Sequence, residues 1–145
     1  MLKNYERILV AVDGSKNAEL ALEHAVDIAA QNQAALYILR IIDEQAISHS
    51  SFAFSKVMEE EKELAENEME QHLTYAAQHD LSTVTSIIEI GNPKEWVATL
   101  IPTEENIDLL VIGATGKGRL SEKTVGSTTT YVVQNAPCTV LVVKE

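Results

Sequence analysis

The sequence predicts an α/β fold: an open five-stranded parallel sheet of strand order 3-2-1-4-5 with helices on both faces. Apolar segments suited to strands alternate along the chain with amphipathic segments suited to helices. Four of the five strand segments are continuous apolar runs, which is typical of strands covered on both faces of a parallel sheet. The order 3-2-1-4-5 uses right-handed crossovers and makes the first and fourth strands neighbours.

The first half of the chain begins with an apolar strand and a turn, where Ser15 is suited to cap the following helix. In that helix small and apolar residues recur at three- and four-residue spacing. A second apolar strand, an irregular polar segment and a long helix follow. These elements are expected at residues 7–12 (strand), about 16–32 (helix), 35–42 (strand), 43–51 (irregular) and about 54–79 (helix).

The second half of the chain repeats the alternation with shorter helices. A third strand ends in turn residues, and Pro93 suits the first turn of a short helix whose buried side is Trp96, Val97 and Leu100. Pro137 ends the last helix. The expected elements are strands at 84–90, 108–112 and 138–143, with the last helix at 128–135.

Composition and charge narrow the function classes. A chain of 145 residues suits a single domain, here residues 1–145. The net charge of −11 argues against nucleic acid or an anionic membrane as a partner. Seven glutamates and one lysine between Glu59 and Glu70 are interpreted as a solvated helix face. Without a long apolar run or an apolar signal core, and with one cysteine, the chain is expected in the cytoplasm.

A glycine-rich segment, Gly113 to Ser127, joins the fourth strand to the last helix. Glycines allow close approach of backbone to a ligand, and a helix N-terminus offers unpaired N–H groups. Such a segment suits phosphate groups. Lys117, Arg119 and Lys123 against Glu122 make it locally basic. The alternative interpretation is a surface loop whose glycines only form turns.

The glycine-rich segment does not match two well-known phosphate-binding patterns. Gly113 and Gly118 have the spacing of a Walker A loop, but Arg119 and Leu120 stand where lysine and a hydroxyl residue are needed. A dinucleotide fingerprint would follow the first strand, and the segment there, Asp13-Gly14-Ser15, lacks it. A mononucleotide site is therefore preferred.

Position in the fold adds a second loop to the candidate site. Ligands of open parallel sheets bind beyond the carboxyl ends of the strands, where the strand order reverses. With the first and fourth strands adjacent, Asp13 lies opposite the glycines and could accept hydrogen bonds from ribose hydroxyls. Supporting the turn before the first helix is an equally good role for Asp13. Ser127 could likewise donate to a phosphate or cap the last helix.

Several motifs are spread along the chain. The first strand closes on Val12-Asp13-Gly14-Ser15, Gly91-Asn92-Pro93 precedes the short helix, and Asn135-Ala136-Pro137-Cys138 leads into the last strand. The glycine-rich segment has the spacing Gly113-x2-Gly116-x9-Gly126-Ser127. With these motifs the sequence resembles the universal stress protein family over essentially its whole length, and the glycine spacing, the most specific of them, is that of ATP-binding members. The implied fold is Rossmann-like, of the adenine nucleotide alpha hydrolase type.

The resemblance implies a role for each site residue. Asp13 would contact ribose or adenine, and the glycines would lie along ribose and phosphates. Ala11 and Thr139 depart from the family, since proline is common at both positions. The implied adenine nucleotide site comprises Ala11, Val12 and Ile41 near the base, Asp13, Gly113 and Gly116 in the middle, and Gly126, Ser127 and Thr128 at the phosphates.

The sequence favours a binding protein over an enzyme. No second acidic residue stands as a clear metal ligand, the four histidines lack metal-ligand spacing, and no catalytic residue is assigned. We expect a stress-response module that binds ATP, with or without Mg²⁺, and hydrolyses it slowly at most. The alternatives are a phosphoryl-transfer or ATP-hydrolysing enzyme, and an interaction module that binds AMP or cyclic AMP.

The last strand, residues 138–143, predicts a homodimer. The order 3-2-1-4-5 leaves this apolar strand at an edge of the sheet, where it is an aggregation liability unless it is covered. Pairing with a second copy would cover it through a two-fold contact. The family resemblance implies the same assembly.

Overall fold

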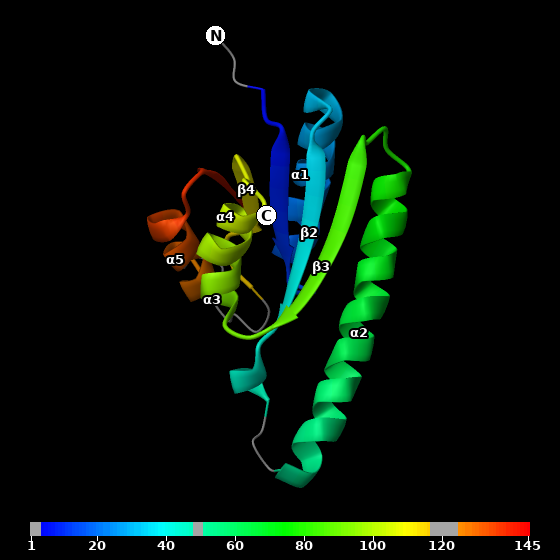
Figure 1. The fold of residues 1–145 in the computed structure, drawn as a ribbon, viewed down its shortest axis with the longest axis vertical. Coiled ribbons are helices and arrows are strands. Elements are labelled where there is room, and N and C mark those ends of the chain that lie inside the picture. Colours follow the sequence, from blue (N-terminus) through cyan, green and yellow to red (C-terminus); the bar gives the residue numbers. More distant parts are fainter. Residues whose placement is uncertain (1–3, 48–50, 117–124) are drawn as a thin grey trace.

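The fold, taken from a computed structural model that describes residues 4–47, 51–116 and 125–145, is a five-stranded parallel sheet flanked by helices (Figure 1). The strand order is β3-β2-β1-β4-β5, and every pairing is parallel. This confirms the predicted fold class and order. The strands are β1 (Arg7–Val12), β2 (Ala35–Ile42), β3 (Thr83–Ile90), β4 (Leu109–Gly113) and β5 (Thr139–Val143).

Helices cover the two faces of the sheet separately. On one face, α1 (Lys16–Asn32) and α2 (Ser51–Ala77) pack on the even-numbered residues of β1 and β2. On the other face, the chain from Pro93 to Glu104 and α5 (Ser127–Asn135) cover the odd-numbered residues. Buried apolar contacts on both faces explain the continuous apolar runs of the central strands.

Strand β5 differs from the other apolar runs because it lies at the sheet edge. The expectation that it is buried on both faces is wrong for this chain alone. Thr139 is exposed, and the side chain of Val142 is 37% exposed. Within the described part of the chain only β4 pairs with β5, so no described strand lies beside its outer edge.

The segment after β3 is helical, as predicted, but its middle turn is a π-helix. Asn92 caps α3 (Pro93–Glu95), which continues into the π-helix η2 (Trp96–Leu100) and then α4 (Ile101–Glu104). The wider π-turn moves the buried face along by one residue. Val97 and Ile101 are therefore buried, whereas Leu100 is 45% exposed, which corrects the prediction that Leu100 faces the core.

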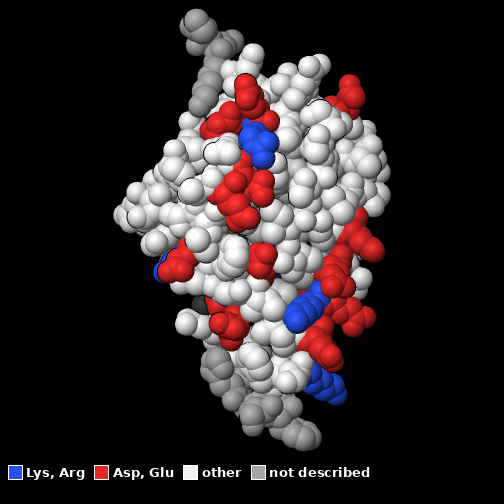
Figure 2. All heavy atoms as spheres, viewed as in Figure 1, with Lys and Arg blue, Asp and Glu red and all other residues white. Residues whose placement is uncertain are grey.

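The acidic stretch of α2 is mainly solvated, as expected. Red acidic side chains follow the right-hand edge of Figure 2, where α2 lies in Figure 1. Two glutamates depart from this interpretation, since Glu61 and Glu68 are half-buried. Glu61 lines a cavity, and Glu68 pairs with Arg40 of β2. None of the helices that the structure describes is long and apolar enough to cross a membrane.

Candidate functional site

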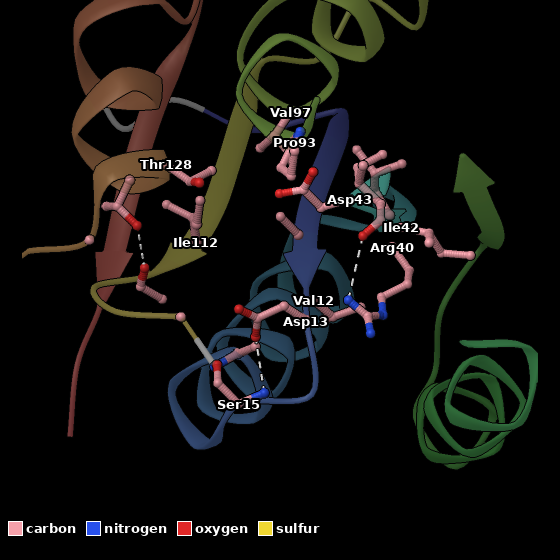
Figure 3. Close-up of a pocket in the computed structure, with 18 of the residues that line it drawn as sticks. Val12, Asp13, Ser15, Arg40, Ile42, Asp43, Pro93, Val97, Ile112 and Thr128 are labelled. Atoms are coloured by element: carbon pink, nitrogen blue, oxygen red, sulfur yellow. Dashed lines mark hydrogen bonds between the residues drawn. The ribbon is translucent and has the colours of Figure 1, made fainter. Parts of the chain in front are cut away.

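A cavity of about 460 Å³ opens at the carboxyl ends of β1, β2 and β4 (Figure 3). This is the place where ligands bind in open parallel sheets. All nine residues that the sequence predicted for the nucleotide site line it: Ala11, Val12, Asp13, Ile41, Gly113, Gly116, Gly126, Ser127 and Thr128. Residues far apart in the chain thus surround one space.

Asp13 supports the turn after β1 and also lines the cavity. Its Oδ1 accepts a hydrogen bond from the backbone N–H of Ser15 at 2.9 Å. Ser15 in turn caps α1 through its Oγ, which accepts from the backbone N–H of Ala18 at 3.2 Å, as predicted. Gly14 has a φ of +85°, a conformation that glycine adopts without strain. The turn role proposed for Asp13 is therefore present, while its carboxylate remains part of the cavity wall.

The first two glycines of the β4–α5 connection are needed for close packing against the β1 side. A Cβ on Gly113 would lie 2.9 Å from the carbonyl carbon and the Cβ of Asn17. A Cβ on Gly116 would lie 2.5 Å from Oδ2 of Asp13. A side chain at Gly113 would therefore push the two segments apart, whereas one at Gly116 would displace the carboxylate of Asp13.

On its other side the Gly113–Gly116 segment is held by β5 and α5. The backbone N–H of Ala114 donates to the carbonyl of Val143, and that of Gly126 donates to the carbonyl of Ala114, both at 2.7 Å. The buried hydroxyl of Thr129 donates to the carbonyl of Gly113 at 2.6 Å. These bonds fix the segment next to the start of α5.

The N-terminus of α5 opens onto the cavity without a side-chain cap. Gly126 is the N-cap residue, in extended conformation, and Ser127 is the first helical residue. Of the two roles considered for Ser127, capping is thus absent, because the cap position belongs to Gly126. The first N–H groups of a helix have no partner within it, and here they adjoin the cavity.

Several of the basic side chains considered in the sequence analysis are not described by the structure. Lys117, Arg119 and Lys123, with Glu122, lie outside the described residues. The same is true of His49, one of the four histidines of the chain. Within the described ranges, no group of three or more His, Cys, Asp or Glu side chains could hold a metal ion.

Sequence reasoning missed several residues of the cavity wall. Arg40, Asp43 and Glu61 place charges at its β2 end, and Figure 3 shows Arg40 and Asp43 across the cavity from Ile112 and Thr128. Nη1 of Arg40 lies 3.5 Å from the carbonyl oxygen of Ile41. The remaining wall residues are Ser15, Ala18, Leu39, Ile42, Ala46, Ile47, Pro93, Val97, Ile112, Thr115 and Thr129.

Local signals could have indicated some of these residues but not Arg40. Asp43 directly follows β2, and Thr115 is the second residue after β4, at the edge where a site was expected. Arg40 lies inside an apolar run, and its burial depends on Glu68, 28 positions away. His72 lies on the same helix as Glu68. Its burial lowers its pKa, which the nearby carboxylates of Glu68 and Glu19 partly offset.

Comparison with known proteins assigns the family. A model of the Universal stress protein family matches residues 4–144. A curated relative from Staphylococcus haemolyticus, assigned to the same family, is 34% identical over 97% of this chain and 85% of its own length. Universal stress protein UspA from Lactobacillus plantarum has 35% identity and a TM-score of 0.90, over 98% of this chain and 99% of that one.

A more distant solved structure shares the fold. It is a universal stress protein in complex with cAMP, 21% identical, with a TM-score of 0.69 over 97% of this chain and 98% of that one. This likeness supports the fold along nearly the whole chain, and the family model and the two relatives above support the shared sequence pattern. The chain belongs to the universal stress protein family.

Proposed function

We propose that this chain is an ATP-binding universal stress protein, in which the nucleotide-bound state acts in the stress response and hydrolysis is slow at most. One observation carries the proposal. The nine residues predicted for nucleotide binding come from β1 and the turn after it, from β2, and from the stretch between the end of β4 and the start of α5, and all line one cavity. Its volume, about 460 Å³, lies within the usual range of small-molecule sites.

The proposed orientation places the phosphates at α5. Gly126, Ser127 and Thr128 offer backbone N–H groups and hydroxyls at the positive end of the helix dipole, which favours anions. Asp13 then faces the ribose, and Ala11 and Ile41 lie near the base. The apolar wall residues of β1 and β2 suit the flat face of a purine.

The proposal assigns no catalytic residue. Asp13, whose carboxylate lies beside Gly116, supports the turn with Oδ1. We therefore expect turnover well below one per second. Multiple-turnover hydrolysis of ATP at about 1 per second or faster, a rate ordinary for enzymes, would favour the alternative of a phosphoryl-transfer or ATP-hydrolysing enzyme.

A second candidate ligand is cyclic AMP, because one universal stress protein of this fold has been solved in complex with it. A single phosphate could be held by the α5 N-terminus alone. An AMP- or cyclic-AMP-binding interaction module would then need no triphosphate. Relative affinities separate the two proposals.

The decisive experiment is a calorimetric titration of nucleotide-free protein with ATP, ADP, AMP and cyclic AMP, with and without Mg²⁺. Mass spectrometry of the protein as purified identifies any nucleotide that it retains. ATP binding tighter than AMP and cyclic AMP supports the main proposal. Tighter binding of cyclic AMP favours the second candidate, and no binding of any of the four contradicts both.

We also propose that the functional unit is a homodimer formed through β5. Among the described strands none pairs with the outer edge of β5, and the side chain of Val142 in this strand is exposed to solvent. Strand pairing across a two-fold axis would satisfy the open backbone groups and cover the apolar side chains. Sedimentation at micromolar concentration tests the assembly directly.

A further inference from the structure

Thr115 lies in the middle of the cavity wall, between the two glycines that pack against the β1 side. Its Oγ1 accepts a hydrogen bond from the side-chain amide of Asn17, Nδ2 to Oγ1, at 2.7 Å. Asn17 is the second residue of α1, so this bond joins two segments that are 98 positions apart. Both partners are part-buried, and Thr115 lines the cavity.

The hydrogen bond from Asn17 determines what the hydroxyl of Thr115 can still do. A threonine hydroxyl has one proton and two acceptor lone pairs. One lone pair is used by Asn17, whose amide nitrogen can only donate. Among the described residues, no acceptor takes the Thr115 proton. The hydroxyl is therefore left as a donor at the cavity wall.

The position of this donor is fixed by its neighbours. Gly113 packs directly on the backbone of Asn17, and Gly116 packs on the carboxylate of Asp13. The segment is also tied to β5 through Ala114. Donors held in place before a ligand arrives contribute more affinity, because little ordering cost remains on binding.

We propose that Thr115 is a further ligand-binding residue, which donates a hydrogen bond to an oxygen of the sugar–phosphate part of the nucleotide, and that Asn17 is a positioning residue which directs this donor. The inference rests on the proposed nucleotide site. It adds a side-chain contact that the glycine-rich pattern does not contain.

The test compares ATP affinities of variants by calorimetry. Thr115→Val removes the hydroxyl at nearly constant shape and should weaken binding up to about tenfold, the range expected for the loss of one hydrogen bond. Thr115→Ser keeps the hydroxyl and should stay within about twofold. Thr115→Ala repeats the removal if the valine variant folds poorly. Thr74→Val, on exposed α2, is the matched control and should bind as wild type.

Asn17 variants test the direction of the hydrogen bond. Asn17→Asp accepts the Thr115 proton and turns it away from the cavity, so it should weaken binding about tenfold. In the Thr115→Val background, Asn17→Asp can change ATP affinity only through the added negative charge. Subtracting this effect in a double-mutant cycle leaves the contribution of the Asn17–Thr115 hydrogen bond. Asn17→Ala should weaken binding in wild type and add nothing in the Thr115→Val background.

Each outcome decides between the proposals. Repeating the Thr115→Val titration with ADP, AMP and adenosine locates the acceptor, because a loss that persists with adenosine assigns it to the ribose. Wild-type affinity in Thr115→Val, equal losses in Thr115→Ser and Thr115→Val, or additive losses at Asn17 and Thr115 overturn this inference alone. Wild-type protein that binds no nucleotide overturns the proposed function and this inference together.

Discussion

Nε of Arg40 lies 3.4 Å from Oε2 of Glu68, between β2 and the acidic helix α2. Both atoms are buried, and neither has a hydrogen-bond partner among the described residues. The side chains are only 10% and 22% exposed, so both charges are largely removed from water. A pair of this kind depends on each partner to neutralise the other.

Removing one partner of this pair should destabilise the fold strongly. Arg40→Met or Glu68→Leu leaves an uncompensated buried charge and should lower the free energy of unfolding by about 3 kcal/mol. The double variant should recover most of that loss. Urea denaturation measures the three variants. As a control, Lys16→Ala breaks an exposed pair with Glu145 and should cost under about 1 kcal/mol. A double variant as unstable as the worse single one would contradict the prediction.

Stability should fall with acid through His72. Burial lowers the folded-state pKa of His72 below its ordinary value of 6.5, although Glu68 and Glu19 oppose this shift. Between the two pKa values the unfolded chain binds more protons, so stability is lost as pH falls below about 6.5. His72→Gln should flatten this part of the stability curve, measured by urea denaturation between pH 5 and 8. A stability curve that falls as steeply below pH 6.5 in His72→Gln as in the wild type would contradict this prediction.

Gly113 should be intolerant of even a methyl group. Its Cβ would lie 2.9 Å from the backbone carbonyl carbon of Asn17, which cannot rotate away. Gly113→Ala should therefore cost about 2 kcal/mol of unfolding free energy. At Gly126 the nearest atom to a Cβ is 3.5 Å away, so Gly126→Ala should keep most of its stability. Thermal unfolding compares the two, and equal losses would be inconsistent with the close approach to Asn17.

Gly126→Ser should raise stability and weaken ATP binding together. Gly126 has the extended conformation of an N-cap residue (φ −65°, ψ 156°). The hydroxyl oxygen of a serine there would accept a hydrogen bond from a backbone N–H of the first turn and stabilise the fold by about 0.3 kcal/mol. It would also occupy a donor that the proposed phosphate site needs, which should lower ATP affinity about fivefold. Gly126→Ala is the matched variant without the cap oxygen. Undiminished ATP binding in Gly126→Ser would argue against phosphates at α5.

The proposed dimer should be sensitive to charge on β5. Val142→Lys places an ammonium on the outer strand, where it would be buried by a second copy. We expect a monomer, or insoluble protein if the exposed edge aggregates, by analytical ultracentrifugation. Leu64→Lys changes a similarly exposed apolar residue on α2 and should leave the dimer intact. A wild-type monomer at micromolar concentration would contradict the proposal.

Much of the fold could be predicted because the responsible signals are local. Apolar runs mark the strands, Ser15 marks the start of α1, and Pro93 begins the helix after β3. The face that each helix buries was harder to predict. The π-turn of η2 exposes Leu100, and no single-residue signal in the sequence distinguishes it from an ordinary helical turn.

Parts of the candidate site could also be predicted from the sequence, whereas other parts could not. Asp13 and Gly116 could be expected to meet because adjacent parallel strands end at the same edge of the sheet. The bond from Asn17 to Thr115 depends on the rotation of α1 about its axis, and the burial of Arg40 depends on Glu68. Both are set by packing between distant segments, which periodicity does not report.

The hydrogen bond from the N–H of Ala114 to the carbonyl of Val143 connects β5 to the cavity as well as to the sheet edge. Its inner edge holds the segment that borders the cavity, and its outer edge is the one that the proposed dimer would pair. Thermodynamic linkage would then couple nucleotide binding to dimer formation, because any shift of β5 on pairing would move Ala114, between Gly113 and Gly116. Within the proposed dimer, ATP affinity should vary with protein concentration, and the dimer's dissociation constant should change by the same factor when ATP is bound.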